Sequence, residues 1–335
     1  MPLFLFFSYN LRYYSAFKTH KSDHTSFLKF YQLLQKMRSD RFKYDDESDQ
    51  KVPTLSGMVE DRIIKAMENE KKNPRRYLFL KIGLVALTLV ISFFWLSYAP
   101  DGLLGKMDAV GYAVCHRIEA RSFHLGDRAI PLCARCSGMQ LGALLAFVYQ
   151  LQWGRKAKLP PLKILMVFGL FFIAFGVDGV NSYLHFFPNA PHLYEPNNTL
   201  RLLTGTGLGL GIGAVLYPVF NQTLWTDWED QAALGSWKRL FALIGLGLLL
   251  DVIILSENVL FLYPLAVLSG LTVLFVLGIC YTMIILLLFK KENEFTTVRS
   301  AWVPLLAGLT VAILQTYLID IVRFNWTGTW GGFPL

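Results

Sequence analysis

Residues 262–289 read LYPLAVLSGLTVLFVLGICYTMIILLLF, and this apolar run decides the fold class. It contains no Asp, Glu, Lys or Arg over its 28 residues. At a rise of about 1.5 Å per residue, an α-helix of this length exceeds the roughly 30 Å thickness of the hydrocarbon core of a bilayer. A chain inside the bilayer must satisfy its own backbone hydrogen bonds, so the run predicts a transmembrane helix.

Six further apolar runs accompany this one, and together they predict an all-α integral membrane protein with about seven transmembrane helices. Charged residues make up only 17% of the chain, against roughly 25% in soluble proteins. The fifth run is short and contains Asp251, so six spanning helices with one re-entrant segment remain an alternative. The predicted spans are Tyr77–Tyr98, Cys136–Trp153, Leu162–Leu184, Thr199–Phe220, Leu240–Leu255, Leu262–Phe289 and Trp302–Val322.

The first span divides the chain into two parts. Residues 1–76 are predicted to form a soluble, basic, cytoplasmic extension that is partly helical and partly disordered. Residues 77–335 are predicted to form a polytopic helical membrane domain, in which residues 105–215 hold the cysteine and histidine motifs.

The net charge of +8 is distributed as in a membrane protein. The lipid bilayer is therefore the expected partner, and a nucleic acid is not. Lysines and arginines cluster before the first span and after the second, fourth and sixth spans, whereas residues 185–198 and 256–261 contain none. Cytoplasmic loops are enriched in Lys and Arg, so this pattern predicts a multi-pass cell-membrane protein with its N-terminus cytoplasmic and its C-terminus outside. Residues 101–135 are an exception, because they are predicted to form an outside loop and yet carry five cations.

Three of the four cysteines lie within 22 residues in that loop, next to a histidine. Cys133 and Cys136 form a CxxC pair, a spacing that brings two sulfur atoms onto one turn for metal binding or for redox chemistry. Cys115 and His116 supply a third sulfur and an imidazole, enough for a tetrahedral zinc or iron site. Ser137 follows the pair in place of a histidine, which argues against covalent haem attachment.

Ionisable residues inside membrane spans are costly and mark function. Five such residues are predicted at the membrane face that carries the cysteines: Asp178, Arg201, Asp251, Asp320 and Arg323. Asp178, Arg135 and Arg201 are the predicted catalytic residues. An anionic small molecule or lipid headgroup is predicted to bind Arg121, Arg201 and Asn198. Arg201 and Asn198 stand at a helix N-terminus, where an anion could be held.

The fourth predicted span carries glycines at a spacing of four residues. Gly205, Gly209 and Gly213 share one face of the helix, and Gly207 and Gly211 share another. Faces of this kind let neighbouring membrane helices approach closely. The run also contains a GxGxxG-like string, but it follows no strand and lies within the membrane, so a dinucleotide site is not predicted.

The cysteine motif resembles that of a prokaryotic membrane-protein family, domain of unknown function 2085, over residues 105–215. The resemblance rests on Cys115-His116, on residues 121–123 (RSF), on residues 131–138 (PLCARCSG) and Gly142, and on residues 197–201 (NNTLR) followed by Thr204-Gly205. It departs from the family pattern at Arg117, Ser137, Met139 and Gln140. None of these departures removes a candidate metal ligand. The resemblance implies a membrane protein and attaches no activity to it.

Three hypotheses for the function follow from these residues. The first is a metal-binding membrane protein, with Cys115, His116, Cys133 and Cys136 as ligands and Asp178 as a general base or a residue that orients a ligand. The second is a thiol–disulfide oxidoreductase that uses the CxxC pair, with Cys115 as the resolving thiol. The third is a transporter or scaffold whose cysteines form a structural disulfide. The sequence leaves open whether the protein is an enzyme.

Overall fold

The computed structural model describes residues 74–187, 191 and 193–332. The predicted N-terminal extension therefore lies outside the described residues, except for its last three residues, which begin the first described helix.

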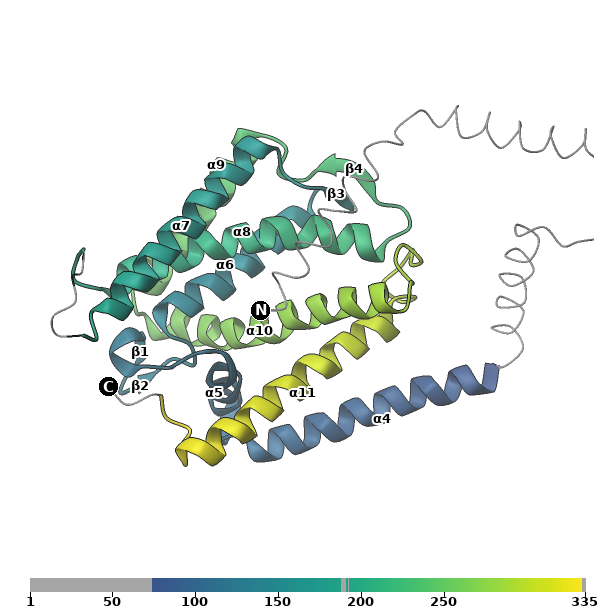
Figure 1. The fold of residues 1–335 in the computed structure, drawn as a ribbon, viewed down its shortest axis with the longest axis horizontal. Helices are drawn as coiled ribbons and strands as arrows, with labels where there is room; N and C mark the ends of the chain where they lie inside the picture. Colours follow the sequence, from purple (N-terminus) through teal and green to yellow (C-terminus); the bar gives the residue numbers. More distant parts are fainter. Residues whose placement is uncertain (1–73, 188–190, 192, 333–335) are drawn as a thin grey trace, which may run out of the picture. The chain divides into compact units, whose positions relative to one another are not determined.

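Each of the seven predicted spans is an α-helix (Figure 1), which confirms the all-α membrane class. The helices extend the predicted spans by a few residues at several ends. Their bounds are α4 (Pro74–Tyr98), α6 (Ala134–Leu151), α7 (Leu162–Leu184), α8 (Asn198–Leu224), α9 (Trp237–Leu255), α10 (Val259–Leu288) and α11 (Trp302–Thr327).

Five of the described helices are long and apolar enough to cross a membrane, namely α4, α7, α8, α10 and α11. Helix α6 has only 18 residues and includes Arg135 and two glutamines, which lowers its hydropathy. Helix α9 is one continuous helix of 19 residues that carries two cations and Asp251. The described helices therefore agree with a polytopic membrane protein, and the number of spans depends on whether α6 and α9 also cross the bilayer.

An eighth helix, α5 (Gly102–Val114), lies within the segment that was predicted to be an outside loop, so that prediction was wrong in this part. The helix packs against α10 and α11, and Ala109, Val110 and Tyr112 are fully buried. Its 13 residues cover about 20 Å, too short to span a bilayer, which is why no apolar run of spanning length marked it. Helix α4 lies at the edge of the bundle beside α11 (Figure 1), with most of its apolar side chains exposed.

Glycines line the interface between α6 and α8, which is the most extensive helix–helix contact in the described part of the chain. A Cβ atom on Gly205 would lie 2.2 Å from the Arg135 carbonyl oxygen, and one on Gly209 would lie 2.2 Å from that of Met139. The second glycine face packs on α7, where Gly207 meets the ring of Phe171. The predicted packing role of both faces is therefore confirmed, and it sets the first turn of α6 directly against the first turns of α8.

The two ends of the bundle differ in chemistry. One end, called here the cysteine end, holds the three clustered cysteines, the 3-10 helix η2 (Glu119–Arg121) and the antiparallel pair β1 (His124–Leu125) and β2 (Arg128–Ala129). The other, the basic end, holds the parallel pair β3 (Lys156–Lys158) and β4 (Glu229–Ala232), where Lys156 pairs with Glu229.

Candidate functional site

The three-cysteine cluster forms where the end of α5 meets the start of α6. Cys115 caps the C-terminus of α5, and Cys133 caps the N-terminus of α6 one turn before Cys136. The two segments touch closely, since a Cβ atom on Gly111 would lie 2.0 Å from the carbonyl oxygen of Pro131. As a result the three sulfur atoms lie within 4.8 Å of one another.

The Cys115 sulfur is the most stabilised of the three as a thiolate. It accepts hydrogen bonds from the backbone amides of Arg117, at 3.4 Å, and of Cys133, at 3.5 Å. Arg117 has a φ of 53°, a left-handed conformation that non-glycine residues seldom adopt. The Cys133 and Cys136 thiols donate to the Cys115 sulfur and hold its pKa well below the usual range of a thiol, although burial opposes this.

His116, the fourth predicted metal ligand, is not part of the cluster. Its Nδ1 atom lies 3.7 Å from the Cys115 sulfur, and the group of potential ligands in the described part of the chain comprises the three cysteines. The imidazole therefore contacts the Cys115 sulfur but is not grouped with all three sulfur atoms. Cys280, in the middle of α10, is likewise separate.

A second set of contacts joins the segment around Cys115 to α11 and to the residues that follow it. The Arg323 guanidinium, on α11, donates to the carbonyl oxygen of Cys115 at 2.7 Å and to that of Tyr112. Arg117 donates to the carbonyl oxygen of Trp330 at 2.8 Å and to Asp108 at 2.7 Å. The sequence indicated the position of Arg323 in its span. It contained no signal for the contacts of Arg323 with Cys115 and Tyr112 or of Arg117 with Trp330, which join residues more than 200 positions apart.

Arg135 and Asp178 form a buried ion pair that joins α6 to α7. The Arg135 Nε atom donates to Asp178 Oδ2 at 3.0 Å, and its Nη2 atom donates to the same oxygen. Asp178 Oδ1 accepts a hydrogen bond of 2.8 Å from Tyr194, and the Asp178 side chain is only 1% exposed. The structure therefore brings these two predicted residues together as partners, and both Asp178 oxygens are occupied. Tyr194 is a member of this site that the sequence did not reveal.

Arg121 and Arg201 lie near this pair and have far fewer partners. The guanidinium of Arg121 donates to the Ser182 carbonyl oxygen at 3.0 Å and stacks 4.0 Å from the ring of Phe186. That of Arg201 donates to Asn198 Oδ1 at 2.9 Å, and its buried Nε atom has no acceptor among the described residues. The three predicted anion-binding residues are thus neighbours.

The remaining predicted charges each bond to a neighbouring helix. Asp251 of α9 accepts from the Thr206 hydroxyl of α8 at 2.6 Å, and Asp320 of α11 accepts from the Trp95 indole of α4 at 3.1 Å. Each contact joins two helices through a buried carboxyl group, which is how polar residues hold membrane helices together. The other oxygen of Asp320, Oδ1, is buried and has no hydrogen-bond partner among the described residues.

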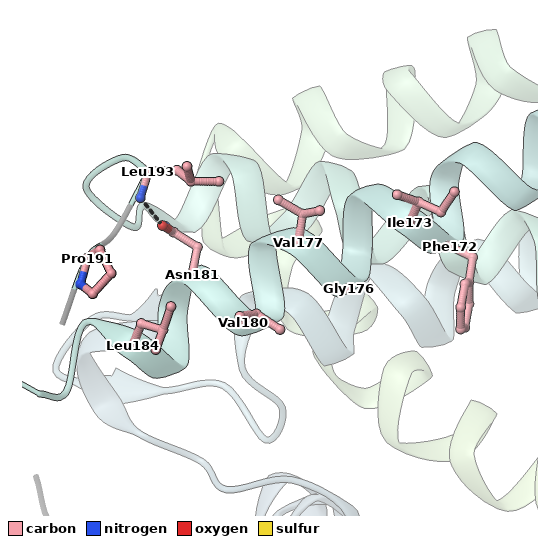
Figure 2. A pocket seen from close by; sticks show the side chains of 9 residues that line it. All are labelled: Phe172, Ile173, Gly176, Val177, Val180, Asn181, Leu184, Pro191 and Leu193. Atoms are coloured by element: carbon pink, nitrogen blue, oxygen red, sulfur yellow. Dashed lines mark hydrogen bonds between the residues drawn. The ribbon is translucent and has the colours of Figure 1, made fainter.

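An apolar groove of about 380 Å³ runs along α7 (Figure 2). Its lining includes Phe172, Val177 and Val180, and at one end Leu193 of the following loop. The polar side chain in the groove is Asn181, whose Oδ1 accepts from the Leu193 amide at 2.6 Å (Figure 2). The groove offers apolar surface to lipid chains and contains none of the predicted site residues.

Comparison with known proteins finds the same segment. The model of the family described as predicted membrane protein (DUF2085) matches residues 115–215, from the first clustered cysteine to the middle of α8. An uncharacterised protein of the archaeon Methanothermobacter thermautotrophicus is 32% identical over 113 residues, 33% of this chain and 90% of the relative. An uncharacterised protein of Methanocaldococcus jannaschii is 26% identical over 125 residues, 36% of this chain and 72% of the relative.

No solved structure matches the chain. The segment that the family model matches contains all three clustered cysteines, Asp178 and Arg201. The resemblance predicted from the motifs is confirmed, and the chain belongs to the DUF2085 family of predicted membrane proteins.

Proposed function

We propose that this membrane protein binds one Zn²⁺ or Fe²⁺ ion through Cys115, Cys133 and Cys136. The observation that carries the proposal is the distance of at most 4.8 Å between any two of the three sulfur atoms. Around a tetrahedral ion with metal–sulfur bonds of about 2.3 Å, two sulfurs lie about 3.8 Å apart. The cluster therefore needs only a small contraction to become three corners of a tetrahedral site.

The backbone supports ligation in a second way. Amides of Arg117 and Cys133 donate to the Cys115 sulfur, and such hydrogen bonds stabilise the thiolate form that a metal requires. Three protein ligands leave a fourth position, which catalytic zinc sites use for water or substrate. A rotation of His116 would instead close the site and make it structural.

In the catalytic form, the centre would act on an anionic small molecule or lipid headgroup held by Arg121, Arg201 and Asn198. In this proposal Asp178 and Arg135 position the metal ligands and do not react themselves. Their ion pair fixes the turn that carries Cys133 and Cys136 against α7, and neither Asp178 oxygen is free to act as a base.

The orientation of the protein is part of the proposal. We place the cysteine end on the outside of the cell membrane, with residues 77–335 as the membrane domain, residues 1–76 as a cytoplasmic extension and the C-terminus outside. The basic end supports this orientation, since Arg155, Lys156 and Lys158 gather there, opposite the cysteines.

Thiol–disulfide exchange is the second candidate, and the lowered pKa of Cys115 favours it. Cys133 and Cys136 donate to the Cys115 sulfur, and this is the main reason why its pKa lies below that of an ordinary thiol. With Cys133 and Cys136 as the active pair, the Cys115 thiolate would be the resolving nucleophile. It would attack the disulfide between them, form a new disulfide with one of the two and release the other as a thiolate.

Substitution by Co²⁺ tests the ligand set in the full-length protein. The optical spectrum of bound Co²⁺ reports both tetrahedral geometry and thiolate ligation, and its intensity falls with each thiolate removed. We expect the spectrum in the wild type and in Cys280→Ser, the matched control, and its weakening in Cys115→Ser, Cys133→Ser and Cys136→Ser. Equal spectra in all four variants would contradict the proposed ligands.

A further inference from the structure

We propose that Arg121 and Arg201 form a binding site for a phosphate group at the cysteine end of the bundle. The inference deepens the proposed function, on which it rests for its biological role, by naming the chemical class of group presented to the metal centre. The phosphate belongs either to a lipid headgroup or to a small soluble phosphate.

The first observation is the burial of two cations without an anionic partner. Arg201 is 6% exposed and Arg121 is 7% exposed. Neither forms an ion pair with a carboxylate in the described part of the chain; their hydrogen bonds go to the Asn198 side chain and to the Ser182 carbonyl oxygen. Burying a charge without a counter-ion is costly, so a site of this kind is complete only with an anion.

The second observation is the unused hydrogen-bonding capacity of Arg201. A guanidinium carries five N–H donors in a rigid planar fork. The Nη1 atom of Arg201 is bonded to Asn198, whereas its Nε atom is buried and meets no acceptor among the residues that the structure describes. The unused donors of this fork match two oxygens of one oxyanion.

The third observation is that Asp178 does not supply the missing negative charge. Its carboxylate is bound by Arg135 through two nitrogen atoms, and its other oxygen accepts from Tyr194. Burial, followed by repulsion from Arg201 and Arg135, lowers the pKa of Arg121 to about 10. The three guanidinium groups therefore share one region that holds a single carboxylate.

The proposed metal centre offsets part of this excess charge, but not all of it. A divalent ion with three thiolate ligands carries one net negative charge, because three negative charges exceed two positive ones. Two unpaired guanidinium groups still leave a surplus cation. The N-terminal end of α8, where Asn198 begins the helix and Arg201 lies in the first turn, adds further positive potential.

Phosphate fits this surplus better than a carboxylate does. It is a tetrahedral oxyanion with enough acceptor oxygens to engage two guanidinium forks at once and carries up to two negative charges near neutral pH. The Phe186 ring stacked on Arg121 shields one side of the site from water, which strengthens the charge interactions within it.

Ligand-dependent thermal unfolding of the full-length protein in lipid nanodiscs tests the proposal. Inorganic phosphate is titrated against wild type in phosphatidylcholine nanodiscs, and a second series replaces part of that lipid with phosphatidic acid. A rise of Tm with inorganic phosphate assigns a soluble source, and a rise with phosphatidic acid alone assigns a lipid headgroup. Absence of a rise in both series would overturn the proposal.

Three variants identify the residues. Arg201→Gln and Arg121→Gln are expected to weaken the apparent affinity by about tenfold or more, which is the scale of a lost charge-assisted hydrogen bond. Arg201→Lys keeps the charge but loses the fork, so it is expected to fall between Arg201→Gln and wild type. Lys163→Gln, at the basic end of α7, is the matched control and is expected to bind as wild type does.

A purely structural Arg201 would give a different pattern. Arg201→Gln would then lower Tm by the same amount with and without phosphate, a result that would contradict the site. Metal analysis of the same samples separates the two proposals. Metal without a phosphate response refutes the phosphate site alone, and a phosphate response in a protein that contains no metal refutes the metal centre alone.

Discussion

Arg135, which lies between the two cysteines of the CxxC pair, is bound to Asp178 of α7 through two of its guanidinium nitrogens, with Nε donating at 3.0 Å. Arg135 Nη2 also donates to the Ser182 hydroxyl at 3.0 Å, and the Arg135 carbonyl oxygen lies against Gly205 of α8. One residue thus ties the cysteine turn to two neighbouring helices. The position of Cys133 and Cys136, the proposed metal ligands, therefore depends on this pair.

Asp178→Asn is expected to destabilise the protein, because it leaves a buried guanidinium without its counter-ion. Removal of one partner from a buried ion pair costs about 3 kcal/mol of unfolding free energy. Chemical unfolding in bicelles measures the loss. The double variant Arg135→Met with Asp178→Leu removes both charges, so it is expected to recover more than half of that loss. A double variant as unstable as the sum of Arg135→Met and Asp178→Leu, each measured alone, would show that the charges do not interact.

Gly209→Ala is expected to force α6 and α8 apart. Its new Cβ atom would lie 2.2 Å from the Met139 carbonyl oxygen, a backbone atom that cannot move away alone. We expect a loss of about 2–3 kcal/mol in unfolding free energy, as in overpacked cores. Gly245→Ala on α9 is the matched control, since nothing lies within 4 Å of its Cβ position. That variant is expected to be neutral or slightly more stable, because alanine favours the helix. Similar losses in both variants would refute the close contact.

Tyr194→Phe is expected to reduce stability in a pH-dependent way. Burial and the hydrogen bond to Asp178 raise the pKa of Tyr194 from 10.0 to about 12. A raised pKa means that its contribution is complete below pH 10 and is lost as the pH rises towards 12. The stability difference between wild type and Tyr194→Phe should therefore be constant between about pH 7 and pH 9 and shrink above pH 10. A difference that does not change up to pH 12 would contradict this bond.

The membrane class and the glycine packing could be predicted because both depend on local patterns. Apolar runs of spanning length define the helices, and a four-residue glycine spacing defines the face between α6 and α8. Helix α5 was missed for the same reason, since its 13 residues are too few to give a spanning signal. The clustering of Cys115 with the CxxC pair followed from residue type and short separation.

The contacts that complete the site could not be predicted, because they join distant parts of the chain. Arg323 reaches the Cys115 carbonyl oxygen from α11, and Tyr194 reaches Asp178 from a loop. The spacing of Asp178 showed that an ionisable residue lies in this span, but it could not show that Arg135 and Tyr194 bind both of its oxygens.

Arg323→Met is expected to weaken metal binding by about 10- to 100-fold, the usual effect of removing a residue that holds a metal ligand in place. Its donors fix the carbonyl oxygens of Cys115 and Tyr112, so their loss frees the backbone of the first ligand. Competition with a chromogenic chelator measures the affinity. Arg299→Met, in an exposed loop at the basic end, is the control and should bind as wild type does. Equal metal affinities in the two variants would show that Arg323 does not position the proposed ligand Cys115.

Elemental analysis of the purified full-length protein, paired with thiol titration, tests whether the three clustered cysteines hold a metal. We expect about one equivalent of zinc or iron per chain in wild type and in Cys280→Ser, and its loss in Cys133→Ser. A protein without metal, in which two thiols appear only after reduction, would contradict the metal centre and leave a disulfide between two of the clustered cysteines.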